Sequence, residues 1–78
     1  MRKQDQELLK ENDQKFVRLH LHDGEVAIVK VLFVSETEQD VTADLISSTH
    51  ISKYEKSDVQ PAFQYRFDDI AWVEPVRD

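Results

Sequence analysis

The sequence predicts a mainly β domain, in which a short N-terminal α-helix (residues 1–15) precedes a small five-stranded barrel (residues 16–76) within one domain of 78 residues. Three observations predict this class. Good helix formers with a thin apolar face fill the N-terminus. From residue 17 onward, apolar side chains recur at every second position, as half-buried strands require. Polar turns containing Asp-Gly, Asp-Asp or proline then separate about five such runs.

Length and composition indicate a small folded protein. A chain of this size buries only about 60% of the surface that its unfolded form exposes. Hydrophobic residues make up 40% and charged residues 33%, which is typical of a globular protein and too apolar for disorder. The absence of cysteine excludes disulfides and thiolate metal sites, so packing or oligomerisation has to stabilise the core. No apolar leader is present, and no stretch approaches the roughly 20 apolar residues that span a bilayer, so we expect a cytoplasmic protein without membrane contact.

The net charge is -6, from 16 acidic against 10 basic side chains. Acidity works against a phosphate-backbone partner, because affinity for nucleic acid comes largely from Lys and Arg. A basic protein partner suits this charge better, although acidity also keeps small proteins soluble. We therefore expect a basic protein, and not nucleic acid, as a partner. A second copy is expected on a different ground, because a five-stranded barrel that does not close fully leaves strand edges that pair between subunits.

Residues 1–13 are rich in Lys, Gln, Glu and Leu and predict the short helix. Asp5 is the expected N-cap, and Leu8 and Leu9 are its apolar anchors. Isolated helices of this length are marginal in water, so the helix is expected to dock on the barrel through these two leucines.

The next stretch predicts a β-hairpin. The alternation places two sets of side chains on opposite faces: Val17, Leu19 and Leu21 on one, and Arg18, His20 and His22 on the other. Asp23-Gly24 is a strong signal for a structural turn, because glycine accepts a positive φ without steric cost. Residues 25–34 follow as a long, bent second strand that is apolar on both faces apart from Lys30.

Residues 35–40 then predict a polar turn, and residues 41–46 a third strand. Residues 47–61 have no clear period and end in proline, which indicates a long loop with a strand extension near residues 51–54. Long loops in compact domains are usually functional or disordered.

The last part of the chain predicts two more strands. Residues 62–67 alternate cleanly, Asp68-Asp69 makes a tight break, and residues 70–73 form a last strand closed by Pro75. The candidate subunit interface consists of the apolar side chains of these two strands, namely Phe63, Tyr65, Phe67, Ile70 and Trp72. Such aromatics can stack nucleic-acid bases, but a stacking platform needs interleaved basic residues, and here Arg66 stands before two aspartates. We therefore predict that they serve the core or an interface between subunits.

Two histidines raise the question of a metal site. His20 and His22 lie on one strand face with Asp23 and Glu25 close in sequence, and two imidazoles with a carboxylate can ligate zinc or iron. A closed site needs about four ligands, and the remaining His50 falls in the predicted loop. We therefore predict solvent-facing histidines without metal or cofactor, and a metal-dependent enzyme remains the least favoured alternative.

Other catalytic patterns are also missing from the sequence. It has no cysteine, no Gly-x-Ser-x-Gly elbow and only one glycine, which excludes a phosphate-binding loop. Asp68 and Asp69 are explained as solvated turn formers. We therefore predict a protein that is not an enzyme.

The order of these pieces resembles an Sm-like domain. The most specific part is similar to the first half of the Sm1 signature and consists of Val17, Leu19, Leu21, Asp23 and Gly24. The resemblance implies a ring in which the fourth strand of one subunit, here residues 62–67, pairs with the fifth strand of the next, here residues 70–73. It also implies RNA binding at loops on the inner rim as the alternative function.

The residues that carry RNA binding in such proteins are replaced here. Where RNA-binding members have a second Gly, an Asp and an Asn, this chain has Val29, Ser35 and Gln39, and Asp68-Asp69 stands in place of Arg-Gly. Two carboxylates repel a phosphate ligand. The resemblance therefore favours an oligomeric or protein-binding module.

A second resemblance is to the Rho-binding antiterminator family of small acidic Sm-like proteins. Its L-x-L-x-DGE opening is similar to Leu19, Leu21, Asp23, Gly24 and Glu25 here. In that family the barrel binds a protein, which fits the negative charge of this chain.

Overall fold

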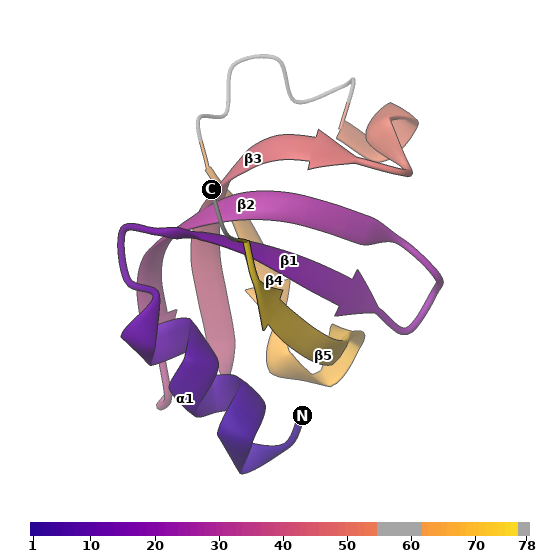
Figure 1. Cartoon of the computed structure of the whole chain (residues 1–78). Coiled ribbons are helices and arrows are strands. Elements are labelled where there is room, and N and C mark those ends of the chain that lie inside the picture. The colour runs from indigo at the N-terminus through magenta and orange to yellow at the C-terminus, as the bar shows by residue number, and fades with distance from the viewer. Residues whose placement is uncertain (55–61, 77–78) are drawn as a thin grey trace.

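The computed structural model describes residues 1–54 and 62–76 (Figure 1). The helices are α1 (Lys3–Glu11), η1 (Ile51–Tyr54) and η2 (Phe67–Asp69), of which the last two are 3₁₀ helices. The strands are β1 (Phe16–Leu21), β2 (Val26–Ser35), β3 (Asp40–Ser48), β4 (Phe63–Arg66) and β5 (Ile70–Pro75). The predicted class, mainly β with an N-terminal helix, is therefore confirmed. No helix in these residues is long and apolar enough to cross a membrane.

The strands form one antiparallel sheet in the order β4-β3-β2-β1-β5. The register shifts twice between β2 and β3, once between Ile28 and Val29 and once between Val31 and Phe33. It shifts again between β1 and β5, next to His20. Such irregularities bend strands and increase their twist, which curls the sheet around its own core. Strands β4 and β5 are left as its two edges.

The period-two pattern predicts the buried faces of β1 and β3 correctly, whereas β2 is apolar on both faces in sequence. The core contains alternating residues from the first three strands, namely Val17, Leu19, Leu21, Ala27, Val29, Val31, Val41 and Ala43. The later strands and η2 add Tyr65, Phe67, Ile70 and Val73. Each of these residues is less than 9% exposed, and removing their apolar surface from water stabilises the fold.

Helix α1 packs against this core, as predicted, through a fully buried Leu9 and a partly buried Leu8. The prediction that Asp5 is the N-cap is wrong. Arg2 occupies the N-cap position without a side-chain cap, and Asp5 lies in the first turn, 1% exposed. Its Oδ1 accepts a hydrogen bond from the Val73 backbone N–H of β5 at 3.1 Å. A buried N–H needs an acceptor, so Asp5 joins the helix to the sheet and does not start the helix.

The chain turns between β1 and β2 at Asp23 and Gly24. Gly24 has a φ of 94°, and its N–H donates to the Leu21 carbonyl at 3.1 Å. The Asp23 carboxylate accepts a hydrogen bond from the Glu25 N–H at 2.9 Å, which fixes the backbone of Glu25 at the end of the turn.

Several predicted boundaries shift. The strand extension predicted near residues 51–54 is wrong, because these residues form the 3₁₀ helix η1, with the Lys53 N–H donating to the His50 carbonyl at 3.0 Å. The predicted break at Asp68-Asp69 is the 3₁₀ helix η2, which also takes Phe67 from the fourth strand. Residues 55–61 of the predicted long loop lie outside the described residues.

Candidate functional site

The structure separates the two histidines that the sequence placed side by side. His20 stacks on Trp72 of β5, with ring centroids 3.7 Å apart and planes 7° apart. Its Nε2 lies 2.8 Å from the Glu74 carboxylate, which also accepts from Arg18 at 3.0 Å. His20 is therefore held by side chains across β1 and β5, contrary to the expectation that it faces water. His22 is exposed, and within the described residues neither histidine belongs to a group of three or more metal-ligating side chains.

A different polar cluster forms around Glu25, which is fully buried. Its carboxylate accepts hydrogen bonds from the Ser48 hydroxyl at 2.6 Å, the Lys53 ammonium at 2.5 Å and the Tyr54 hydroxyl. The Tyr65 hydroxyl donates in turn to that of Tyr54 at 3.1 Å. We call these five residues the Glu25 cluster. It ties η1 to the start of β2, the end of β3 and strand β4.

The electrostatics of the Glu25 cluster fix its protonation. Burial alone raises the pKa of Glu25, but hydrogen bonds from Lys53, Ser48 and Tyr54 hold the pKa below its ordinary value. The hydrogen bond to Glu25 raises the pKa of Lys53. Burial, followed by the bond to Glu25, raises the pKa of the Tyr54 hydroxyl, and burial likewise raises that of Tyr65. The carboxylate therefore stays charged, the lysine stays an ammonium, and both phenols stay protonated at neutral pH.

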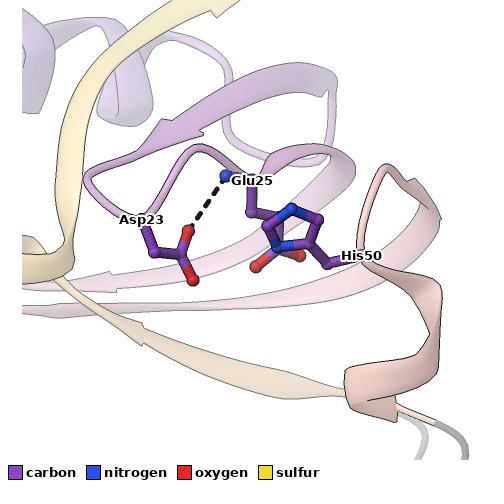
Figure 2. Close-up of side chains that lie close together, drawn as sticks. All are labelled: Asp23, Glu25 and His50. Atoms are coloured by element: carbon purple, nitrogen blue, oxygen red, sulfur yellow. Dashed lines mark hydrogen bonds between the residues drawn. The ribbon is translucent and has the colours of Figure 1, made fainter.

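One triad has the spacing of a metal site. Asp23, Glu25 and His50 each offer a ligand atom within 4.8 Å of the others, and Figure 2 shows them converging from the β1–β2 turn and the chain after β3. However, the Lys53 ammonium lies 3.1 Å from Asp23 Oδ2 and 2.5 Å from Glu25 Oε1. Because these two carboxylates already share a cation, we assign no metal here. The sequence missed this triad because His50 lies in the segment read as a loop.

A pocket opens beside the cluster, with a volume of about 450 Å³. The end of β1 and its turn, helix η1, strand β4 and helix η2 all line it. Two of its aromatic side chains, Tyr54 and Phe63, meet edge to face, with centroids 4.9 Å apart and planes 77° apart. Asp23 and Asp69 also line it, so aromatic surface and carboxylates border the same space. Such a size is within the range of small-ligand sites in proteins.

The predicted interface residues divide into two groups. Tyr65, Phe67 and Ile70 lie in the core of the single chain, at 7%, 1% and 0% exposure. Phe63 is half-buried at the pocket, and Trp72 is 40% exposed on edge strand β5. Of the five predicted interface residues, Phe63 and Trp72 are therefore the two that are accessible to another molecule on the surface of the folded chain.

Among solved structures, the chain is similar to the SmAP (LSm) protein from Methanococcus vannielii, with a TM-score of 0.65 and 16% sequence identity. The match covers 95% of this chain and 98% of that chain. No protein-family model and no curated protein matches the sequence. The resemblance drawn from the order of strands and turns is thus confirmed at the level of structure, and the chain has an Sm-like fold.

Proposed function

We propose that this chain is a self-assembling, non-enzymatic module, in which β4 of one copy pairs with β5 of the next. The observation that carries the proposal is the open sheet, which leaves β4 and β5 as its two edges. An edge strand presents unpaired N–H and C=O groups that favour pairing with another chain. Because the two edges differ, pairing one with the other is heterologous and generates a ring if the rotation closes.

The side chains at β5 support this pairing. Trp72 is 40% exposed on β5, and exposed aromatic residues are enriched at the centres of protein interfaces. One donor on this strand is already used, since the Val73 N–H donates to Asp5. Pro75, which has no N–H, ends the strand. The proposed pairing is therefore short and uses the backbone groups of β5 on either side of Val73.

The protonation of the Glu25 cluster supports a role without catalysis. A nucleophilic or basic group needs a pKa near the working pH. Here the pKa of Lys53 is raised by its bond to Glu25 and that of Tyr54 is raised by burial, so neither group loses a proton near neutrality. The cluster is suited to holding η1 in place and not to proton transfer.

RNA binding is a second candidate function of this module, and it is tested separately. The expectation that nucleic acid is not a partner rests on the net charge and on the residues that replace the RNA-binding positions, and it has no support from the Sm-like fold. A salt titration decides this point, because affinity for a phosphate backbone falls steeply with log salt concentration. Binding of an oligouridine probe that weakens steeply with salt would add RNA to the partners of this module.

The test of assembly is the absolute mass in solution, measured by light scattering over a range of protein concentrations. We expect a stable mass of several subunits for the unmodified chain. Trp72→Ala is expected to weaken association, since truncating an interface aromatic costs about 2 kcal/mol or more, roughly 30-fold in affinity.

Phe33→Ala is the matched control. Phe33 is a 62% exposed aromatic residue on central strand β2, away from both edges, and its loss should leave the mass unchanged. A monomer at every concentration refutes the proposal. Equal effects of the two variants would show that association does not use the β5 edge. Circular dichroism of each variant verifies that the fold is retained.

A further inference from the structure

The pocket between the β1–β2 turn, η1, β4 and η2 has a preorganised aromatic wall. Tyr54 and Phe63 meet nearly at right angles, with their centroids 4.9 Å apart. The Tyr54 hydroxyl donates to the buried Glu25 and accepts from Tyr65, so the ring is fixed at both its edge and its tip. A wall held in this way loses little conformational entropy when a ligand binds.

Carboxylates give the pocket a negative potential. Asp69 is exposed, and within residues 1–54 and 62–76 its carboxylate accepts no hydrogen bond and pairs with no basic side chain. Lys53 is the only lysine or arginine that lines the pocket in this part of the chain. Its ammonium is bonded to Asp23 and Glu25, so its charge is more than offset. A cationic ligand is therefore favoured over an anionic one.

We propose that this pocket binds the guanidinium group of an arginine side chain from a basic protein partner. Aromatic faces attract cations, and arginine most often makes this contact in proteins. A carboxylate accepts a charge-assisted hydrogen bond from the guanidinium, which is stronger than a neutral one. Asp69 supplies the carboxylate, and Tyr54 and Phe63 supply the aromatic faces. The net charge of -6 attracts a basic partner toward the site.

This site shares strand β4 with the assembly proposed above but uses different chemical groups of it. Self-association uses the backbone edges of β4 and β5, whereas the arginine site uses side chains from four elements around the pocket. Each proposal therefore survives or fails by its own measurement.

The experiment is an NMR titration of the full ¹⁵N-labelled chain with the blocked peptide acetyl-Gly-Arg-Gly-amide. The comparison peptide carries citrulline in place of arginine, which keeps the shape of the side chain and removes its charge. We expect saturable shifts for the His22 and Asp23 amides and for the Gln64 side-chain amide, with a millimolar Kd. The citrulline peptide should leave these signals unmoved.

Two matched variants test whether the Asp69 carboxylate binds the guanidinium group. Asp69→Asn should weaken binding by roughly two- to fivefold, the range expected for one exposed ion pair. The adjacent Asp68→Asn changes an exposed carboxylate that does not line the pocket, and the Kd should stay the same. The spectra themselves verify that both variants fold.

Three results overturn the proposal. They are an absence of saturable shifts at peptide concentrations well above the millimolar range, equal shifts from the citrulline peptide, and an unchanged Kd in Asp69→Asn. If uridine monophosphate shifts the same signals and the arginine peptide does not, the pocket is an anion site and the assignment is wrong.

Discussion

Glu25 is a fully buried carboxylate whose negative charge is balanced inside a small core. An unpaired buried charge costs several kcal/mol, so its retention depends on the donors that surround it. Ser48, Lys53 and Tyr54 supply three such hydrogen bonds, and no buried side-chain polar atom in the described residues lacks a partner. The residue therefore stabilises the fold only as a member of its cluster.

Replacing this carboxylate by an amide tests its contribution. Glu25→Gln keeps the volume but leaves donors that face it without a charged acceptor, so the free energy of unfolding should fall by about 1–3 kcal/mol. Urea denaturation followed by circular dichroism measures this change. Glu38→Gln, at an exposed position in the β2–β3 turn, is the control and should fall within about 0.5 kcal/mol of the unmodified chain. Equal stability of the two variants would contradict a structural role for the cluster.

The same residue predicts how stability depends on pH. Because the folded-state pKa of Glu25 is below its ordinary value of 4.5, its contribution is fully present above pH 4.5 and is lost as pH falls through the lower, folded-state value. Hydrogen bonds to Asp23 and Glu74 lower their pKa values too, so they add to the same acid-side loss. The urea midpoint should therefore fall as pH decreases below 4.5, and Glu25→Gln should show a shallower decline. A decline of the same steepness would exclude Glu25 as its source.

Single residues also show where sequence reasoning ends. The positive φ at Gly24 could be predicted because glycine tolerates it. Gln14 and Gln39 adopt φ values of 63° and 57°, which the sequence does not signal, because glutamine has no special preference for this conformation. The burial of Glu25 could not be predicted either. The side chains that compensate its charge, Ser48, Lys53 and Tyr54, are more than 20 positions away in the sequence.

Among the elements, α1 depends on the barrel more than on its own sequence. Nine residues are too few for a stable isolated helix in water. Leu9 anchors the helix by apolar burial, and Asp5 anchors it by accepting the Val73 N–H of β5. The leucines could be predicted from their apolar character. The role of Asp5 could not, because its partner lies 68 positions away.

Removing this acceptor is expected to loosen the helix from the sheet. Asp5→Ala leaves a buried backbone N–H without a partner, which costs about 1–3 kcal/mol of unfolding free energy. Glu7→Ala removes an exposed carboxylate from the same helix and should change stability by less than about 0.5 kcal/mol. Amide hydrogen exchange at Val73 checks the mechanism, because its protection should drop in Asp5→Ala alone. Unchanged protection would show that the bond does not hold the two elements together.

The elements of the sheet differ in how well they could be predicted. The period-two alternation in β1 and β3 identified these strands and their buried faces, because one side of each strand packs on the core. Strand β2 is apolar on both faces in sequence, so alternation did not tell which of its faces is buried. Helix η1 was read as strand, since the ISKY tetrapeptide is short and carries a β-branched residue and an aromatic residue. Its Tyr54 and Lys53 bond to Glu25, and this tertiary contact overrides the local preference.

At the scale of the whole molecule, the Sm-like fold could be predicted because it depends on the order of strands and turns. The pocket could not, because its wall comes from β1, η1, β4 and η2, which are distant in sequence. Of the candidate interface residues, Tyr65, Phe67 and Ile70 are in the core of the single chain, and Trp72 is on its surface. Alternation tells which residues share a face, but it does not tell which strand is an edge.

Assembly through the edges links stability to concentration. If β4 and β5 pair between folded copies, association stabilises the folded state by mass action, by about 2.7 kcal/mol when the partner is at a hundredfold excess over Kd. The melting temperature of the unmodified chain should therefore rise with protein concentration. In Trp72→Ala the same rise should require a roughly 30-fold higher protein concentration, whereas Phe33→Ala should follow the unmodified chain. Differential scanning calorimetry over a wide concentration range measures all three melting temperatures. If the melting temperature of the unmodified chain does not change with concentration, the single chain is stable without association, and the proposed edge pairing does not contribute to its stability.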